Sequence, residues 1–282
     1  MPALQNKIDF AVVLSVKNAN PNGDPLNGNR PRTDYNGIGE ITDVCIKRKL
    51  RDRLLESGQH VFVQSDDRKN DDATSLKDRA EKTLGKAFGS SETTKLACEK
   101  WFDVRAFGQL FAMSSKKTKK KEGEEEGDSK GVSIPIRGPV TVQSAFSLEP
   151  VEVTSTQITK SVSGEGDGTK RGSDTMGMKH RVDGGTYVFY GSMNPQLAER
   201  TGFNDQDAEV IKQLLPRLFE NDASSARPEG SMEVLKVIWW KHNSKAGQYS
   251  SAKVHRSLSV KVNGEIEIQS LDGLGPEIIP GF

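Results

Sequence analysis

The sequence predicts an α+β fold of the ferredoxin-like type, the βαββαβ arrangement that RNA-recognition-motif domains use. Four segments alternate apolar and polar side chains with the period of a strand, and two segments carry apolar side chains at helical spacing. Insertions set aside, their order is strand, helix, strand, strand, helix, strand. At 282 residues, the chain is long enough for one large domain with sizeable insertions.

The first strand and the first helix have the clearest patterns. The strand is expected over residues 8–17, with one strongly apolar face. That face consists of Ile8, Phe10, Val12, Leu14 and Val16. The helix is expected over residues 42–55, with Thr42 as its N-cap and an apolar stripe that should lie on a sheet. The stripe consists of Ile46, Leu50 and Leu54.

A helical insertion follows. Residues 59–64 are typical of a short strand, whereas residues 73–88 and 92–113 have helical patterns. Gly108 interrupts the second pattern, and a close packing contact is the expected reason. Residues 114–131 form a lysine block and then an acidic block without apolar anchors, which indicates a mobile surface loop.

The remaining elements complete the order. The second, third and fourth strands are expected over residues 139–148, 186–193 and 233–241, and the second helix over residues 205–221. The second strand should turn Val140, Val142, Ser144, Phe146 and Leu148 to one face. Between the second and third strands, a segment rich in glycine and cations is expected to form a flexible arm. Asn263-Gly264 marks a hairpin near the end of the chain.

The first strand leads into a surface suited to a polyanion. The loop over residues 18–32 is rich in asparagine, glycine and proline, which expose backbone amides. The helix beside it adds five cations, Lys47, Arg48, Lys49, Arg51 and Arg53. The alternative interpretation of these cations is a solvated helix face. A net charge of only +1 excludes a wholly basic binder, so nucleic acid would have to bind at this local patch.

Catalytic patterns are scarce. The four histidines are scattered without metal-ligand spacing, and the sequence contains no Cys-x-x-Cys pair, nucleophile elbow or phosphate-binding loop. We therefore expect no cofactor, no metal and no enzyme activity. The alternative is a metal-dependent endoribonuclease that uses Asp24 or Asp34 in the first loop. Against it, aspartates beside proline, asparagine and glycine commonly cap turns.

Two further features concern the compartment. Cys45 and Cys98 lie in helix-like segments, where lone buried thiols are the usual interpretation. The sequence contains no run apolar enough to span a bilayer and no signal-peptide pattern. We expect a cytoplasmic protein without a membrane partner.

Several separate motifs resemble those of one protein family, and they follow one another in the same order as in that family. They lie at residues 18–25, 29–32, 43–52, 103–108, 138–140 and 175–177. Together they are similar to the Cascade backbone subunit of CRISPR systems, the Cas7 family, with the type I-C (Dvulg) branch as the nearest match. The resemblance covers most of the chain, but residues 114–131 have no counterpart in it.

The resemblance implies a shape like a right hand. The palm spans residues 1–282 as a single domain, with a helical finger region at 57–132 and a thumb arm at 154–185. Copies of the chain would stack head to tail along guide RNA (crRNA), together with other Cascade subunits. They would protect the guide and present it for pairing with target DNA in antiviral defence. Because base pairing reads the sequence, the protein needs to contact only the RNA backbone and to fit the shape of the RNA.

The resemblance also implies which residues bind RNA. Near the guide phosphates it places Asn20, Asn22, Gly23, Arg30, Arg32, Lys47, Arg48 and Arg51, and Lys49 is a further candidate. In the arm, Met176 and Met178 would form an apolar wedge, while Lys179 and Arg181 grip the RNA backbone. The alternative interpretation is that Met176 and Met178 belong to a disordered loop and have no binding role. Arg105 and Phe107 are equally compatible with the core and with the groove.

Overall fold

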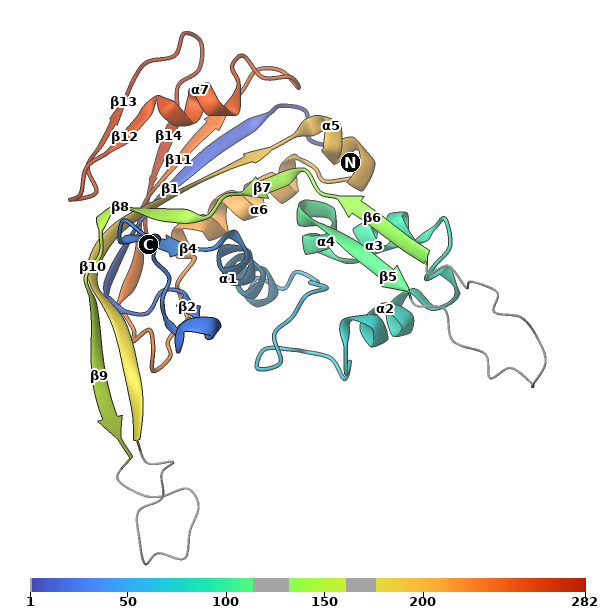
Figure 1. The fold of residues 1–282 in the computed structure, drawn as a ribbon. Coiled ribbons are helices and arrows are strands. Elements are labelled where there is room, and N and C mark those ends of the chain that lie inside the picture. Colours follow the sequence, from blue (N-terminus) through green and yellow to red (C-terminus); the bar gives the residue numbers. More distant parts are fainter. Residues whose placement is uncertain (1, 114–131, 161–175) are drawn as a thin grey trace, which may run out of the picture.

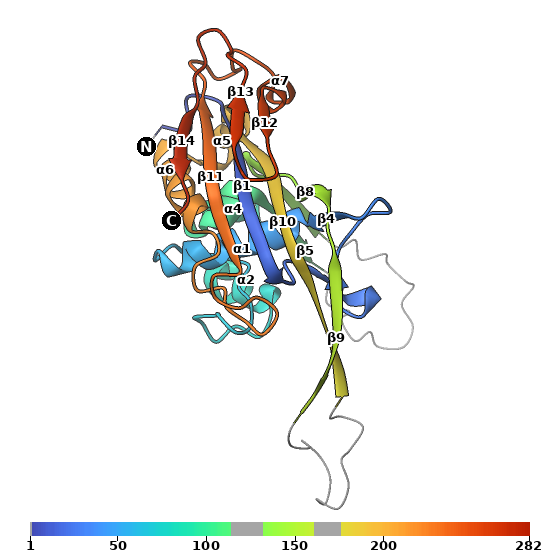
Figure 2. The same cartoon turned by 90° about the vertical axis from the view of Figure 1, so that its left-hand side faces the viewer.

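The computed structural model describes residues 2–113, 132–160 and 176–282. One large antiparallel sheet forms its centre (Figures 1 and 2). The strands of this sheet are β1 (Ile8–Ala19), β4 (Ile38–Ile41), β7 (Val140–Val142), β8 (Ala145–Pro150), β9 (Val153–Thr159), β10 (Met176–Met193), β11 (Met232–Lys241) and β14 (Glu277–Pro280). Their order is β14-β11-β1-β10-β8-β4, and β7 and β9 also pair with β10.

Three smaller strand pairs surround this sheet: β2 (Gly23–Asp24) with β3 (Arg30–Pro31), β5 (Gly108–Met113) with β6 (Val132–Arg137), and β12 (Leu258–Val260) with β13 (Ile266–Ile268). The helices are α1 (Asp43–Glu56), α2 (Leu76–Leu84), α3 (Thr93–Lys100), α4 (Phe102–Phe107), α5 (Pro195–Thr201), α6 (Asp205–Leu214) and α7 (Ser251–Arg256). Short 3-10 turns lie at Pro25–Asn27 (η1), Gly85–Ala87 (η2) and Leu215–Arg217 (η4). The protein is thus a mixed α/β fold built on a large antiparallel sheet.

The predicted order of elements is present as β1, α1, β7 with β8, β10, α6 and β11. In the sheet, β1 and β10 are central, with β11 beside β1 and β8 beside β10. All of these pairs are antiparallel. Side chains of α1 and α6 share one core with β1, so both helices cover the same face of the sheet.

The prediction that β1 has a single apolar face was incomplete. Phe10, Val12 and their alternate neighbours lie in the core beneath α1 and α6, as expected. Ala11 and Val13 on the other face are also fully buried, in a second core that α7 and the β12–β13 pair cover. The small Ala11 side chain weakened the pattern in the sequence, although β1 is covered on both faces.

The first helix agrees with its prediction. The Thr42 side chain caps α1 by accepting a hydrogen bond from the Cys45 N–H at 3.3 Å. The predicted stripe of Ile46, Leu50 and Leu54 is buried against the sheet. This amphipathic face fixes which side chains of α1 point away from the sheet.

The insertion differs from its prediction in two places. Residues 59–64 do not form a strand; instead, the Phe62 and Val63 N–H groups donate to the Asp103 carboxylate. The predicted helix over 92–113 is divided into α3 and α4 and ends at Phe107, and β5 begins at Gly108. Gly108 has φ +81°, and a Cβ there would lie 2.3 Å from the Ile136 carbonyl oxygen. The expected close contact is therefore real, and it coincides with the end of the helix.

The second strand is interrupted. It divides into β7 and β8, and the Gln143 N–H between them donates to Tyr190 O at 2.8 Å. After this break, the residues that point into the core are shifted by one position. Ala145 and Ser147 are buried, whereas Phe146 is 47% exposed. The prediction that Phe146 points inward was wrong because the alternation does not continue through the break.

Later boundaries also move. The third strand begins at Met176 rather than at residue 186, since its first half pairs with β9 beyond the end of β1. The second predicted helix ends at Leu214, where a 3-10 turn containing Pro216 follows. The β12–β13 pair confirms the predicted hairpin, with Gly264 at φ +81° in its turn.

The inserted region has a core of its own. Phe62, Trp101 and Phe111 pack together in a cluster separate from the one beneath α1. The sequence segment 114–131 and most of the glycine-rich arm, residues 161–175, lie outside the described residues. No helix among the described residues is long and apolar enough to cross a membrane.

Candidate nucleic-acid interface

The predicted loop after β1 is a tightly held hairpin made of β2, η1 and β3. Asn20 is only 3% exposed and donates to Asn29 O at 2.7 Å. Asn22 Oδ1 accepts hydrogen bonds from the N–H and the hydroxyl of Thr42, both at 2.9 Å. A Cβ on Gly23 would lie 2.0 Å from Asn29 Oδ1. These residues hold the hairpin against the start of α1, which gives its backbone amides fixed positions.

The two hairpin arginines point in different directions. Arg32 pairs with Asp24 across the hairpin at 3.4 Å. Arg30 instead donates from Nη1 to Ser155 Oγ on β9 at 2.7 Å. The hairpin is therefore linked to β9 through one side chain, a link between segments more than a hundred residues apart.

Asp24 and Asp34 support the turn structure. Asp24 Oδ1 accepts from the Leu26 N–H at 3.2 Å, in addition to its ion pair with Arg32. Asp34 Oδ1 accepts from the N–H groups of Asn36 and Ile38 at 2.8 and 2.9 Å. Both carboxylates thus make the turn-capping contacts that are common for aspartates beside proline, asparagine and glycine. Within the described residues, no group of three or more histidine, cysteine, aspartate or glutamate side chains is arranged to hold a metal ion.

The predicted RNA-binding cations of α1 each have an acidic neighbour. Lys47 pairs with Asp43 at 2.9 Å. Arg48 is 57% exposed and pairs with Asp67 at 3.3 Å. Arg51 is 14% exposed and pairs with Asp103 at 2.9 Å. Arg48 therefore presents the most accessible of these three charges, whereas Arg51 is committed to a contact inside the protein.

Lys49, the further candidate on α1, is buried. Its ammonium pairs with Asp222, and burial lowers its pKa more than Asp222 raises it. The same burial raises the pKa of the Cys45 thiol nearby. Lys49 joins α1 to the turn after α6 rather than facing solvent.

A polar hollow of about 240 Å³ lies between the hairpin, α1 and the turn after α6. Its lining includes Asn22, Gly23, Arg48, Arg68 and Arg227. Sequence reasoning missed Arg68 and Arg227 because both lie in irregular segments without a periodic pattern. Arg227 is oriented by an ion pair with Asp222 at 2.9 Å. The hollow brings together cationic donors from three distant parts of the chain. Three carboxylates, those of Asp52, Asp67 and Asp222, also line it and pair with these cations. A phosphate oxygen bound there would therefore share the arginines with carboxylates that already orient them.

The described part of the predicted arm is a two-stranded ribbon formed by β9 and residues 176–182 of β10 (Figures 1 and 2). Met176 and Met178 are 66% and 56% exposed. They lie on one face of the ribbon, since alternate residues of a strand share a face. Lys179 and Arg181 lie on the opposite face, and Arg181 pairs with Asp183 at 3.1 Å. The structure thus separates the two pairs that the sequence placed together.

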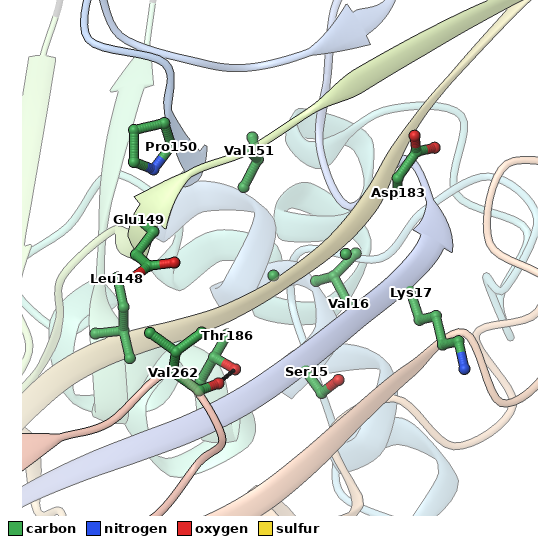
Figure 3. A pocket seen from close by; sticks show the side chains of 12 residues that line it. Ser15, Val16, Lys17, Leu148, Glu149, Pro150, Val151, Asp183, Thr186 and Val262 are labelled. Carbon is green, nitrogen blue, oxygen red and sulfur yellow. Dashed lines mark hydrogen bonds between the residues drawn. The ribbon is translucent and has the colours of Figure 1, made fainter.

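A second cavity, of about 350 Å³, lies beside the base of the ribbon (Figure 3). Lys17, Glu149 and Asp183 contribute its charged side chains, and Val262 of the β12–β13 turn completes its wall. Thr186 donates to the Val262 carbonyl at 2.6 Å, so the turn is held there. The lining mixes both signs of charge with apolar side chains, and we assign no nucleic-acid contact to it.

The fold and these surfaces define a mixed α/β protein with a candidate nucleic-acid interface on the side of the sheet that α1 covers. The family model of "CRISPR-associated protein Cas7" matches residues 6–273, and the chain belongs to the Cas7 family. Members of this family are backbone subunits of CRISPR RNA-guided surveillance complexes.

A relative of known family agrees with this assignment. The chain is 30% identical over 248 residues to a CRISPR-associated protein Cas7 of Haloferax volcanii, an alignment that covers 82% of this chain and 69% of the relative. Among solved structures, a chain of a "CRISPR RNA-guided surveillance complex, pre-nicking" aligns at 14% identity and a TM-score of 0.45, covering 83% of this chain and 78% of that one. A chain of another surveillance complex aligns at 16% identity and a TM-score of 0.43, covering 83% and 68%.

Proposed function

We propose that this Cas7-family chain is the non-catalytic backbone subunit of a type I-C surveillance complex. Copies assemble head to tail along crRNA, contact other Cascade subunits and present the guide for pairing with target DNA. The protein holds RNA by its backbone and shape, and base pairing supplies the sequence specificity. Family membership over residues 6–273 is the observation that carries this proposal.

The division into palm, finger and thumb is part of the proposal. The sheet order β11-β1-β10-β8, with α1 and α6 on one face, supports an RNA-recognition-motif palm. The separate aromatic core supports a finger unit within residues 57–132. The β9–β10 ribbon supports a thumb within residues 154–185.

The RNA-binding surface runs from the polar hollow across the hairpin to the ribbon. Arg48 is the best placed cation of α1, because more than half of its side chain is exposed. Arg68 and Arg227 extend the set of expected phosphate contacts. Asn20, Asn22 and Gly23 act by holding the hairpin amides in place, while the exposed methionines contact bases.

Titration of RNA of increasing length into the purified chain tests the proposal. The oligomers should grow with RNA length, and affinity should fall steeply with salt. A variant carrying Lys47→Ala and Arg48→Ala should show weaker binding to every sequence and a reduced salt slope. Lys253→Ala with Arg256→Ala is the matched control, since it removes two cations from α7 on the other face of the sheet.

The endoribonuclease alternative has a direct test. Guide RNA incubated with the chain and Mg²⁺ should stay intact, because Asp24 and Asp34 are engaged in the turns. Magnesium-dependent cleavage that disappears in an Asp34→Asn variant would overturn the scaffold proposal and show that the protein is a nuclease. Oligomers that form equally well without RNA would indicate that the protein assembles by itself and that RNA does not direct the assembly.

A further inference from the structure

The ribbon extends beyond the sheet that supports it. The pairing of β1 with β10 ends at Ala19 and Val182. From Arg181 to Met176, β10 pairs with β9 alone within the described part of the chain. A two-stranded ribbon by itself is only marginally stable in water. A ribbon that must present side chains at a defined position therefore needs a brace near its base.

Arg30 supplies such a brace. Its Nη1 donates to Ser155 Oγ at 2.7 Å, and Ser155 Oγ lies 2.8 Å from His180 Nδ1. Ser155 and His180 are direct cross-strand partners. One hydroxyl thus connects the hairpin to both strands of the ribbon at once.

The other end of the brace is fixed. Arg30 is the cross-strand partner of Asp24 in the hairpin. The hairpin is in turn bound to α1 through Asn22 and Thr42, which caps the helix. The contacts from Thr42 through the hairpin to His180 form a connected path. The ribbon is consequently oriented relative to α1, the helix that carries the candidate phosphate contacts.

The brace acts on the face that carries the methionines. His180, Met178 and Met176 are alternate residues of β10 and share one face of the ribbon. Val182 continues this series into the core that includes α1. At the base of the ribbon, Gly184 and Gly185 line the cavity beside β10. The contact of Arg30 with Ser155 therefore lies at the base of the face that carries Met176 and Met178, where it can fix their position.

We propose that Arg30 is a positioning residue that holds the ribbon through Ser155, instead of being one of the phosphate contacts. The proposal rests on the proposed function, since it assumes that the ribbon contacts RNA bound along the hairpin and α1. It assigns the hydroxyl of Ser155 a role that no charge or motif in the sequence reveals.

Hydrogen exchange of the RNA-free protein tests the brace itself. Ser155→Thr keeps the hydroxyl and Ser155→Val removes it, while the two side chains have nearly the same shape. Backbone amides of residues 153–159 and 176–182 should exchange roughly threefold to tenfold faster in the valine variant than in the threonine variant. Thr156→Val is the matched control, since Thr156 lies one position away on the opposite face. Equal exchange in the two Ser155 variants would overturn the proposal.

RNA binding then separates positioning from phosphate contact. If Arg30 positions the ribbon, Arg30→Met should weaken binding severalfold without changing the salt slope, and Ser155→Val should have the same effect. The double variant should be no weaker than either single one. A salt slope lowered by about one in Arg30→Met, with normal binding by Ser155→Val, would instead make Arg30 a phosphate contact. Failure of the unaltered chain to bind RNA would overturn the proposed function, and the exchange result would still decide whether the brace exists.

Discussion

Arg51 of α1 and Asp103 of α4 form an ion pair of 2.9 Å that joins the main core to the inserted region. Asp103 is only 1% exposed and also accepts the N–H groups of Phe62 and Val63 at 2.7 and 3.1 Å. The Arg51 guanidinium lies 5.3 Å from the centre of the Phe107 ring. One carboxylate thus orients the irregular segment 59–64, the short helix α4 and a cation of α1.

Loss of Asp103 should destabilise the protein severely. Asp103→Ala leaves Arg51 without its partner and two buried N–H groups without an acceptor, which should lower the free energy of unfolding by about 3 to 5 kcal/mol. Urea denaturation followed by circular dichroism measures the change. Asp67→Ala is the matched control, because Asp67 pairs with the exposed Arg48 and is itself 67% exposed. Equal midpoints for the two variants would contradict a structural role of the Arg51–Asp103 pair.

Gly138 should not tolerate a side chain. A Cβ at this position would lie 2.3 Å from the Ala106 carbonyl oxygen and 2.4 Å from the Gly108 nitrogen. Since both neighbours are backbone atoms, Gly138→Ala should cost about 3 kcal/mol in thermal or chemical unfolding. Gly184→Ala is the comparison, because a Cβ at Gly184 meets nothing within 4 Å. If the two variants were equally stable, the close approach of Gly138 to the end of α4 would not be a constraint.

Alkaline pH should weaken the inserted region through Cys98. Burial raises the pKa of this thiol from 9.0 to about 11. Its contribution to stability is complete below pH 9, the unfolded value, and is lost as the pH rises toward 11. The free energy of unfolding should fall by an amount on the order of 2 kcal/mol across this range. Cys98→Ala should show a smaller decrease over the same range, and an unchanged pH profile would contradict this assignment.

The two faces of the ribbon should respond differently to substitution. Replacing Met176 and Met178 by threonine removes apolar contact area, so RNA affinity should fall without a change in its salt dependence. Replacing Lys179 and Arg181 by threonine removes charges, so the salt slope should decrease. Fluorescence anisotropy with labelled RNA at several salt concentrations measures both effects. A reduced salt slope in the methionine variant would show that the faces do not act separately.

Local patterns predicted the framework of the fold correctly. Helix α1 has its cap at Thr42 and its apolar stripe within a few residues, and the Asn263-Gly264 hairpin is equally local. The first half of β10 was missed because residues 176–182 are mostly exposed and their partner β9 lies beyond the arm. The periodic argument also failed at Phe146, where the break before β8 reverses the alternation.

The candidate site was less predictable than the fold. The sequence shows that Lys49 and Arg51 are cationic, but their partners Asp222 and Asp103 are distant along the chain. Pairing therefore buries charges that a helix pattern alone places in solvent. The hydrogen bond between Arg30 and Ser155 is likewise nonlocal, so it carries no signal at either position.

Strand β10 runs without interruption from Met193 in the main sheet to Met176 in the ribbon (Figure 1). At about 3.3 Å per residue, this is a rod roughly 60 Å long. Its inner half lies between β1 on one side and β7 and β8 on the other, whereas its outer half pairs, among the described strands, with β9 alone. A small rotation of the inner half therefore becomes a larger displacement at Met176, the outer end of the strand. The twist of the central sheet therefore contributes to where Met176, at the outer end of β10, lies.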